Sequence, residues 1–365
     1  MQAETLITAH LADGQQVWNP EVDDTLVCRQ VRNETHDVKT FAFEARTPQL
    51  FRYRPGQFLT FDFEIGGERL NRCYTIASSP TRPHLISITV KRVPGGPVSN
   101  WLHDSMRPGM ALRATGPMGE FTCLSRPAAK YLFMSGGSGI TPLMSMARAY
   151  HDLALPRDIL FVHNARTPAD IIFRDELELM ARTLPSFRFV PVCESDAAGE
   201  RWSGFTGRIS LPMLRLIAPD LLEREVFACG PTPYMAALRG ILGEAGFDTA
   251  RYHEESFDFA TLVGDATEAA AEQAAAEAQT FRVEFTKSRR VVECGADGFV
   301  LNAARAAGMR LPSSCTKGLC GTCKSRLVSG KVDMKHAGGI RQREIDQGMV
   351  LICCAKPLTD LVVER

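Results

Sequence analysis

Four cysteines near the end of the chain have the types and spacing to bind a metal cluster. Cys315, Cys320 and Cys323 form a C-x4-C-x2-C string, and Cys353 follows thirty positions later. Four thiolates at this plant-type spacing suit a [2Fe-2S] cluster, in which each iron needs two terminal thiolates. A structural zinc site is the alternative, but such sites usually combine two C-x2-C pairs and this segment has one. The spacing therefore predicts a [2Fe-2S] cluster.

A glycine-rich turn is the second string that could do chemistry. Ser135-Gly136-Gly137-Ser138-Gly139-Ile140-Thr141-Pro142 follows an apolar run and opens a helical pattern. Glycines let backbone N–H groups approach a phosphate, and a helix N-terminus favours its negative charge. The string matches neither a Walker loop nor the G-x-G-x-x-G spacing. It favours a nucleotide site only together with the strings described below.

The elements that position these strings fall into four stretches. Residues 20–125 hold short β-like runs separated by Gly and Pro, which predicts an antiparallel barrel. In residues 126–258 apolar runs alternate with helix-like segments, which predicts a parallel α/β sheet. Residues 259–279, rich in Ala and Glu, predict a semi-rigid linker ahead of a cluster domain at 280–365. The runs are Val38–Phe43, Phe58–Phe63 and Leu85–Val90 in the first stretch, and Tyr131–Met134, Ile159–Val162, Phe187–Val190 and Val226–Cys229 in the second.

The composition of the 365 residues is typical of a globular protein with two or three domains. No run reaches the roughly 18 apolar residues of a membrane span, and no secretory signal is visible. The eleven cysteines less four ligands leave seven, which cannot all pair, so we expect a reducing cytoplasm. A net charge of zero argues against nucleic acid as a partner.

The zero net charge conceals an uneven distribution. From Thr280 onward, 15 Lys and Arg stand against 8 Asp and Glu, whereas the preceding residues have 27 against 34. Chance is one explanation. The other is that the cluster domain docks electrostatically on the rest of the molecule.

Three further strings complete an ordered set. Arg72-Cys73-Tyr74-Thr75 and Lys91-Arg92-Val93-Pro94-Gly95-Gly96-Pro97-Val98-Ser99-Asn100 lie in the first stretch, and Cys229-Gly230-Pro231 ends the last apolar run. With the turn and the four cysteines, they make the chain resemble the ferredoxin–NADP reductase superfamily, above all the oxygenase-reductase branch typified by phthalate dioxygenase reductase. The resemblance spans about Val22 to Glu364. It implies a multidomain α+β fold with an antiparallel flavin-binding β-barrel, a parallel-sheet α/β nicotinamide domain and a C-terminal β-grasp ferredoxin domain.

The resemblance implies a flavin site on the barrel. Arg72 would pair with a flavin phosphate, Tyr74 would pack on the isoalloxazine ring, and Thr75 would lie near its reactive N5. The length of the second segment favours FAD over FMN. The implied flavin-binding residues are Arg72, Cys73, Tyr74, Thr75, Val90, Lys91, Gly96, Val98 and Ser99.

The resemblance also implies a nicotinamide dinucleotide on the α/β sheet. The glycine-rich turn would face the pyrophosphate, and Cys229 would flank the nicotinamide. The implied set is Gly136, Gly137, Gly139, Thr141, Pro142, Arg166, Cys229, Gly230 and Pro231, with Thr75, Cys229, Glu255 and Phe257 as catalytic residues. Taken singly, Tyr74, Cys229 and Phe257 could be ordinary core residues. We interpret His163 and His253 as structural.

The choice between NADH and NADPH depends on charge near the adenosine. No Asp or Glu ends the second strand-like run, where the Rossmann rule would place a partner for the ribose 2′-OH of NAD. Arg166 could receive a 2′-phosphate, although NADH-using relatives also have an arginine there. The architecture favours NADH, with NADPH as the alternative.

The resemblance implies the reductase of a two-component oxygenase, passing electrons from NAD(P)H through FAD and the cluster to a separate Rieske-type oxygenase. The chain has no paired C-x-H, so hydroxylation must occur elsewhere. Tyr252–Phe257 and Val98–His103 look like the reductases of quaternary-amine demethylases, such as the glycine betaine and carnitine monooxygenases. The alternatives are a reductase for an aromatic-ring dioxygenase or a hybrid-cluster protein, and a redox sensor.

Overall fold

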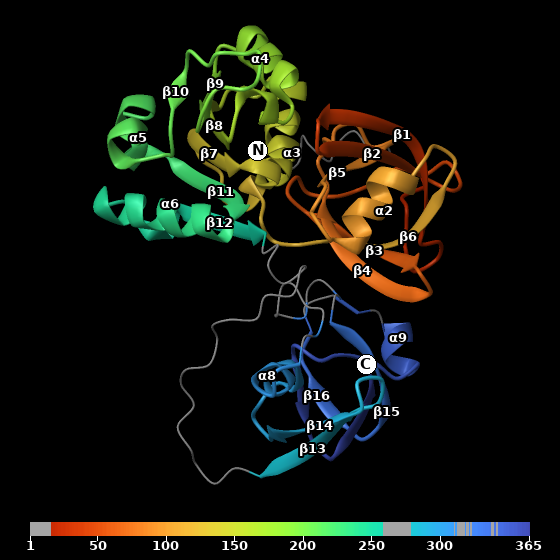
Figure 1. Cartoon of the computed structure of the whole chain (residues 1–365). Coiled ribbons are helices and arrows are strands. Elements are labelled where there is room, and N and C mark those ends of the chain that lie inside the picture. The colour runs from red at the N-terminus through yellow and green to blue at the C-terminus, as the bar shows by residue number, and fades with distance from the viewer. Residues whose placement is uncertain are drawn as a thin grey trace. The chain divides into compact units, whose positions relative to one another are not determined.

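The computed structural model describes residues 16–257, 279–309, 311, 318, 321, 323–336, 339–340 and 342–365. For Glu68, Arg69, Ser256 and Phe257 it describes the backbone alone. The chain divides into two compact units, Met1–Ile65 with Tyr74–Phe257, and Gly66–Cys73 with Asp258–Arg365. In Figure 1 the described part of the first unit runs from red to green, and the C-terminal part of the second is blue.

The flavin-type domain is built on six antiparallel strands. Its sheet order is β4-β3-β6-β1-β2-β5, and Ile76, directly after β4, forms a bridge with Ile88 of β5, so the two edges meet. The closed sheet confirms the predicted barrel, and each predicted run coincides with a strand except that Leu85 precedes β5. The elements are β1 (Thr25–Thr35), β2 (Val38–Ala45), β3 (Phe58–Ile65), β4 (Glu68–Thr75), β5 (Ile86–Lys91), α2 (Pro97–Ser105), β6 (Ala111–Met118) and the 3-10 turn η1 (Cys123–Ser125).

The nicotinamide-type domain is a parallel sheet covered by helices on both faces (Figure 1). Its order is β10-β9-β8-β7-β11-β12, so the chain adds strands on one side of β7 and then returns to the other side at β11. The strands are β7 (Lys130–Gly136), β8 (Asp158–Ala165), β9 (Phe187–Cys193), β10 (Phe205–Thr206), β11 (Glu225–Pro231) and β12 (Tyr252–Phe257). The helices are α3 (Ile140–Asp152), α4 (Arg174–Thr183), α5 (Leu211–Ile217) and α6 (Thr232–Glu244), with 3-10 turns η2 (Gly137–Gly139), η3 (Pro168–Asp170), η4 (Leu221–Glu223) and η5 (Thr249–Arg251).

The apolar runs of this sheet are buried on both faces, which is why they read as continuous rather than alternating. Phe133 packs with α3 and α4 in one core cluster, whereas its neighbour Leu132 packs with α5 and α6 in the other. The switch of strand order falls between β7 and β11. In open α/β sheets, ligands bind at the carboxyl ends of the strands beside such a switch.

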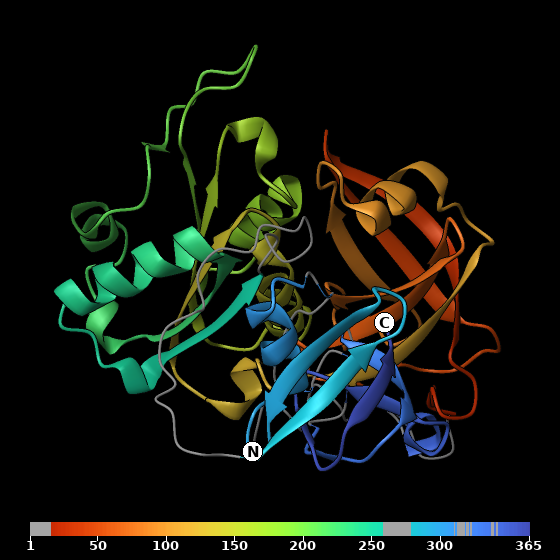
Figure 2. The same cartoon turned by 60° about the horizontal axis from the view of Figure 1, so that its bottom comes forward.

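The C-terminal domain is a mixed sheet whose core includes residues of helix α8. Its order is β14-β13-β19-β15-β17, in which the first and last strands, β13 and β19, pair in parallel. Figure 2 shows the β13–β14 hairpin in cyan and blue. This arrangement matches the expected β-grasp ferredoxin fold. The elements are β13 (Thr280–Phe285), β14 (Arg290–Gly295), α8 (Val300–Ala306), β15 (Lys324–Ser329), β16 (Val332–Met334), α9 (Gln342–Asp346), β17 (Met349–Leu351), β18 (Ala355–Pro357) and β19 (Leu361–Glu364).

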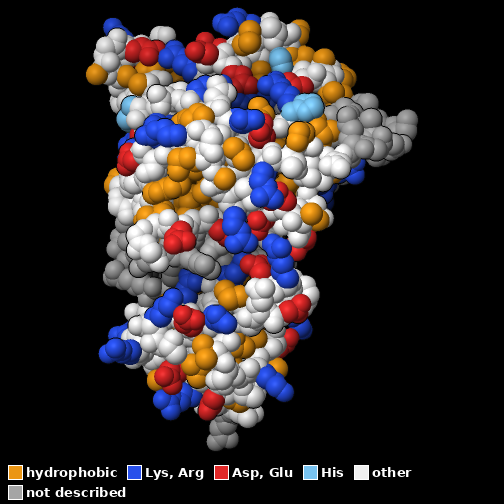
Figure 3. Space-filling model, turned by 90° about the vertical axis from the view of Figure 1, so that its right-hand side faces the viewer, with side chains coloured by type: hydrophobic (Ala, Val, Ile, Leu, Met, Phe, Trp, Pro, Cys, Tyr) orange, Lys and Arg blue, Asp and Glu red, His pale blue; other side chains and the backbone are white. Residues whose placement is uncertain are grey.

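The domain bounds 20–125, 126–258, 259–279 and 280–365 stay predictions, and the linker lies outside the described residues except for Gln279. Among the helices that the structure describes, none has the length and apolar character to span a bilayer. On the face shown in Figure 3, Lys and Arg side chains lie interspersed with Asp and Glu, so neither sign forms a continuous field there.

Candidate cofactor-binding and active site

Strand β4 presents the first group of predicted flavin residues. Because successive side chains of a strand point to opposite faces, Arg72 and Tyr74 share one face and Thr75 lies on the other. The Tyr74 ring packs 6.2 Å from the Phe61 ring, centroid to centroid, and Thr75 is buried. Arg72 donates from Nη1 to the carbonyl of Asn71 at 2.7 Å. An aromatic ring beside a guanidinium can offer a flat ligand a packing surface and an anion partner.

The second flavin segment joins the end of β5 to the start of α2. The Ser99 hydroxyl accepts a hydrogen bond from the Val93 N–H at 3.1 Å and donates to the Gly96 carbonyl at 3.3 Å, so it is turned back onto its own loop. Gly96 caps the helix without a side-chain hydrogen bond. The first backbone N–H groups of α2, those of Val98 and Ser99, therefore suit a phosphate better than the Ser99 hydroxyl does.

The glycine-rich turn lies directly against the end of β11. A Cβ atom on Gly139 would come within 2.3 Å of the Cys229 carbonyl oxygen, and one on Gly230 would come within 2.6 Å of the Tyr234 ring. Gly137 has a φ of 53°, in the left-handed region that glycine adopts at little cost. The absence of side chains at these positions lets the turn and the strand end approach backbone to backbone.

Helix α3 starts at this turn without a side-chain cap, and the Ile140 N–H donates to the Gly137 and Ser138 carbonyls. Gly139 is the N-cap residue and offers no side chain, while the Thr141 hydroxyl donates to the Ser138 carbonyl at 3.2 Å. The helix is 13 residues long, so its N-terminus carries the full partial positive charge of the macrodipole. These features fit a pyrophosphate group, as the sequence pattern predicts.

A row of four reactive side chains crosses the carboxyl end of the sheet. Glu255 on β12 is in register with Cys229 on β11, Cys229 with Ser135 on β7, and Ser135 with His163 on β8. The Ser135 hydroxyl and His163 Nδ1 are 2.7 Å apart. His163 is fully buried, and burial lowers its pKa to about 3, so the ring is neutral. This agrees with a structural role for His163.

Glu255 is the unusual member of this row. Its Oε2 atom is buried and has no hydrogen-bond partner in the described structure. Burial raises the pKa of Glu255 to about 8, so the carboxyl group is largely protonated at neutral pH. A buried carboxyl oxygen without a partner is a point where a bound ligand group would complete the hydrogen bonding. This observation fits a nicotinamide whose polar group reaches the end of β12.

The last residue of β12, Phe257, is in register with Pro231 of β11. Its side chain lies outside the described part of the chain, so its predicted place near the flavin edge stays a prediction. His253 lies 2.6 Å from Glu225 and stacks at 4.7 Å on the Phe227 ring, which agrees with its interpretation as structural.

Two of the four predicted cluster ligands are described. Cys323 and Cys353 are buried in the same apolar core, whereas Cys315 and Cys320 lie outside the described residues. Gly318 has a φ of 70°, and a Cβ atom there would come within 2.8 Å of the Cys354 sulfur. A side chain at this position would collide with the Cys354 thiol, which is not one of the predicted ligands, so the backbone here requires glycine.

Helix α3 connects the glycine-rich turn to the backbone that follows Thr75. The Ser145 hydroxyl donates to the Ser78 carbonyl at 2.7 Å, and Arg148 donates from Nη1 to the Ala77 carbonyl at 2.5 Å. Arg148 is buried and pairs with Glu176 at 2.6 Å. The flavin-type and nicotinamide-type domains are therefore joined by side chains of one helix.

A cavity of about 530 Å³ lies at the seam between the barrel and helices α3 and α4. It is lined by Arg148 with its partner Glu176, and by Arg82, which forms a salt bridge with Asp152. None of the expected cofactor residues lines it. We assign no cofactor to this cavity because these arginines already have partners.

The comparisons with known proteins agree with this geometry. Residues 26–123 match the oxidoreductase FAD-binding domain, 133–240 the oxidoreductase NAD-binding domain, and 283–358 the 2Fe-2S iron-sulfur cluster binding domain. The chain is 47% identical over 343 residues to the glycine betaine monooxygenase reductase subunit of Pseudomonas aeruginosa (strain UCBPP-PA14), covering 92% of this chain and 94% of the relative. This chain belongs to the family of flavin- and [2Fe-2S]-dependent oxygenase reductases.

Two further relatives of this reductase span nearly its whole length. The stachydrine N-demethylase reductase subunit of Rhizobium meliloti (strain 1021) is 40% identical over 341 residues, covering 93% of this chain and 96% of the relative. The solved structure of phthalate dioxygenase reductase matches with a TM-score of 0.56 and 25% identity, over 95% of this chain and all of that one. Its domain order matches the one described above.

The family fixes the cofactors of this reductase as FAD, a nicotinamide dinucleotide and a [2Fe-2S] cluster, and it favours the cluster over a zinc site. When bound, FAD accepts a hydride from the nicotinamide and passes electrons one at a time toward the cluster. The chain's own residues would supply packing surfaces and phosphate partners, beside the carboxyl of Glu255 with its buried oxygen. The individual roles of the predicted residues stay predictions.

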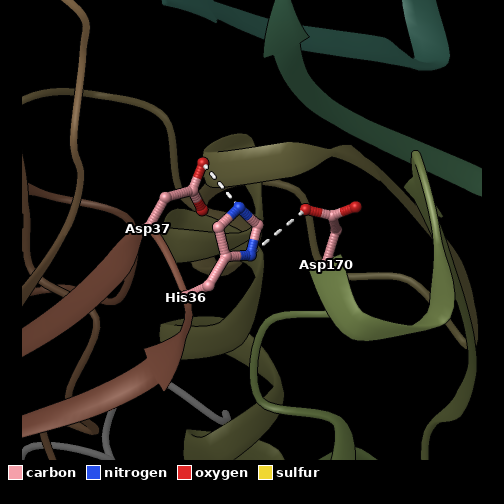
Figure 4. A group of neighbouring side chains, drawn as sticks. All are labelled: His36, Asp37 and Asp170. Carbon is pink, nitrogen blue, oxygen red and sulfur yellow. Dashed lines mark ion pairs between the residues drawn. The ribbon is translucent and has the colours of Figure 1, made fainter. Parts of the chain in front are cut away.

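Sequence reasoning missed two acidic residues beside Arg166. The Arg166 guanidinium lies 3.6 Å from Asp37 of the β1–β2 turn and 3.7 Å from Asp170 of η3. Figure 4 shows both carboxylates with the His36 ring between them. We assign no metal ion to this group because Lys91 and Arg166 already balance the two carboxylates. No local pattern relates Asp37 to Arg166, because they belong to different domains.

Proposed function

We propose that this reductase delivers electrons from NADH to a separate Rieske-type oxygenase that N-demethylates a quaternary amine such as glycine betaine. The observation that carries the proposal is the 47% identity to the glycine betaine monooxygenase reductase subunit over 92% of the chain, which extends through all three domains. The stachydrine N-demethylase relative supports the same reaction class, since its name also describes removal of an N-methyl group.

The geometry supports the proposed placement of the two cofactors. The dinucleotide would lie on the glycine-rich turn with its nicotinamide beside Cys229 and Glu255, and the flavin would lie against Tyr74. Thr75 and the turn are linked through α3, so one helix positions both predicted cofactor sites. Holding two reactants in a fixed geometry is the main contribution that a protein makes to such a transfer.

The test is reconstitution with an oxygenase. The purified reductase, loaded with FAD and cluster, is mixed with NADH, oxygen, glycine betaine and the oxygenase component of a glycine betaine monooxygenase. One NADH and one O2 should be consumed for each formaldehyde and each dimethylglycine formed, with one water as the other product. Release of formaldehyde with this ratio supports the proposal. Cytochrome c reduction without any formaldehyde contradicts it.

Two parallel reactions separate the alternatives. An aromatic-ring dioxygenase component in place of the demethylase should be reduced more slowly if the proposal holds. Catalytic NADH oxidation with cytochrome c distinguishes an electron-transfer enzyme from a redox sensor, which would stop after reduction of its own cofactors. The Cys353→Ser variant is the negative control, because without a cluster it should support no formaldehyde release.

A further inference from the structure

The sheet order places Arg166 at the expected adenosine end of the dinucleotide. The proposed function puts the nicotinamide beside Cys229 on β11 and the pyrophosphate at the turn that follows β7. A ligand extending across the carboxyl edge of the sheet would then reach β8, the neighbour of β7 on the other side. Arg166 follows β8 directly, so its side chain would lie near the adenosine ribose.

Two carboxylates already face the Arg166 guanidinium. Nη2 lies 3.6 Å from Asp37 Oδ2 and 3.7 Å from Asp170 Oδ1. Both distances exceed hydrogen-bond length, so the interaction is electrostatic. Asp170 Oδ1 is buried and has no hydrogen-bond partner in the described structure, which leaves its negative charge directed at the Arg166 guanidinium.

The positions of these carboxylates do not depend on Arg166. Asp37 Oδ2 accepts a hydrogen bond from Lys91 Nζ at 2.5 Å, and its side chain is 19% exposed. Asp170 Oδ2 accepts from the Thr167 N–H at 3.1 Å and from the Thr167 hydroxyl at 2.7 Å, within the capping box of η3. The negative charges are therefore held in place before any ligand arrives.

We propose that Asp37 and Asp170 make this reductase select NADH over NADPH by engaging the charge of Arg166 and repelling a 2′-phosphate. A phosphate monoester carries about −1.5 to −2 charges at pH 7, and it would compete with two fixed carboxylates for one guanidinium. The ribose hydroxyls of NADH bring no charge, and a carboxylate can accept a hydrogen bond from them. This inference rests on the proposed function for the placement of the dinucleotide.

Asp37 makes the selection a joint property of two domains. It lies in the turn between β1 and β2 of the flavin-type barrel, whereas Arg166 and Asp170 belong to the nicotinamide-type domain. A carboxylate supplied by the flavin-type domain explains how the enzyme can discriminate NADH from NADPH although no Asp or Glu ends β8.

The test compares the two coenzymes in the full-length, cofactor-loaded enzyme. Asp37→Asn, Asp170→Asn and the double variant keep the size of each side chain and remove one or two negative charges. We expect the ratio of kcat/KM for NADPH to kcat/KM for NADH, measured by ferricyanide reduction, to rise about fivefold in each single variant. It should rise more than about tenfold in the double variant. The two positions lie on different domains, so one single variant remains informative if the other fails to fold.

Two further variants show whether the gain passes through Arg166. Arg166→Gln added to the double variant should remove most of the gain, because the 2′-phosphate then has no released cation and only the loss of carboxylate repulsion remains. Asp175→Asn, on an exposed position of α4, controls for a general change of surface charge and should leave the ratio at the parent value.

The inference is overturned if the ratio in the double variant stays within about twofold of the parent, or if the full gain persists without Arg166. An equal gain in Asp175→Asn also overturns it. Failure of the proposed function is a separate outcome, since it would appear as NADH-dependent cytochrome c reduction without formaldehyde release and would leave the coenzyme ratio measurable.

Discussion

Cys229 on β11 is in register with Glu255 on β12, and this pairing affects the ionisation of both groups. Burial, and then the Glu255 carboxylate, raises the pKa of the Cys229 thiol, while burial raises the pKa of Glu255 to about 8. Both side chains are therefore uncharged at neutral pH. An uncharged, proton-holding pair at the end of the sheet suits a site where a neutral ring must approach closely.

Glu255→Gln should make the stability of the protein less dependent on pH. The raised pKa means that unfolding releases a proton between about pH 4.5 and 8, so the parent loses stability as the pH rises through that range. The variant, which cannot ionise, should melt at the parent temperature near pH 5 and about 4 to 8 °C higher at pH 9. Thermal unfolding at both pH values measures this.

Glu254→Gln is the matched control for that experiment. Glu254 is exposed and pairs with Arg239 at 2.8 Å. Loss of such a surface pair costs about 0 to 1 kcal/mol, with little change between pH 5 and 9. If the melting temperatures of the two variants change alike with pH, the burial of Glu255 has no thermodynamic effect.

Glu255→Gln should also affect catalysis. The rate of flavin reduction by NADH should fall at least about tenfold in Glu255→Gln, whereas Glu254→Gln should keep the parent rate.

Gly139→Ala should weaken dinucleotide binding. The new Cβ would lie 2.3 Å from the Cys229 carbonyl oxygen, so the turn or the end of β11 must move. We expect a loss of about 1 to 3 kcal/mol in unfolding free energy and a rise of about tenfold in the KM for NADH. Gly240→Ala, with nothing within 4 Å of its Cβ, should stabilise α6 by about 0.5 to 1 kcal/mol and leave the KM unchanged. Equal KM values in all three proteins would contradict the close approach.

Arg224→Met should strongly destabilise the nicotinamide-type domain. The Arg224 guanidinium is fully buried and bonds Asp158 and Asp220, each at 2.8 Å. Removing it takes a buried cation from both carboxylates, at a cost of about 3 to 5 kcal/mol in denaturant unfolding. Arg188→Met, which removes an exposed partner of Asp158, should cost less than about 1 kcal/mol.

The same network of ion pairs should make the free energy of unfolding depend on pH in the acid range. Burial opposes the charge of Asp220, but hydrogen bonds from Arg224 and Lys130 outweigh it and lower the pKa of Asp220 to about 2. A lowered carboxyl pKa contributes stability that is complete above about pH 4 and is lost as the pH falls toward 2. The stability difference between the parent and Arg224→Met should therefore narrow over that range. A constant difference would show that Asp220 is not the coupled group.

Cys353→Ser should abolish the visible absorption and the iron content of the cluster, whereas Cys354→Ser should retain both. The pattern Cys353-Cys354-Ala355-Lys356-Pro357 matches the Cys-x-Ala-x-Pro ending of plant-type ferredoxins, with Cys353 in the ligand position. Both thiols are buried, so burial does not distinguish them. Cluster loss in Cys354→Ser with retention in Cys353→Ser would reverse the assignment.

A fragment that ends at Phe257 should still bind FAD and reduce ferricyanide with NADH. The large apolar clusters of the nicotinamide-type domain involve residues between Val38 and Tyr252 alone, so the fragment keeps its own core. It should fail to reduce cytochrome c rapidly, because the cluster is absent. A fragment that holds no flavin would show that the barrel depends on the C-terminal residues.

Hydrophobic pattern predicted the sheets well because burial of strand residues is a local property of the sequence. The runs around Phe133, Phe161 and Val226 lie within β7, β8 and β11, and their side chains are buried at both faces of the sheet. The glycine-rich turn was predictable for the same reason, since Gly137 and Gly139 are required by the backbone itself.

Contacts between distant parts of the chain could not be predicted. The Asp37–Arg166 pairing depends on how two domains pack, and the unpartnered oxygen of Glu255 depends on what surrounds the end of β12. The hydrogen bonds of the Ser99 hydroxyl could not be predicted either. They join Ser99 to its own loop through a turn geometry that residue type alone does not specify. The predicted ligands Cys315 and Cys320 lie outside the described residues.

The bonds from α3 to the Ala77 and Ser78 carbonyls have a consequence for turnover. The N-terminus of α3 follows the glycine-rich turn, and its middle holds the backbone just beyond Thr75. The separation between Thr75 and the turn is thus set by the length of a helix, at 1.5 Å per residue, once the protein has folded. Within this unit, α3 is a rigid spacer between the two predicted cofactor sites. Bringing these sites together therefore requires no domain closure in each catalytic cycle.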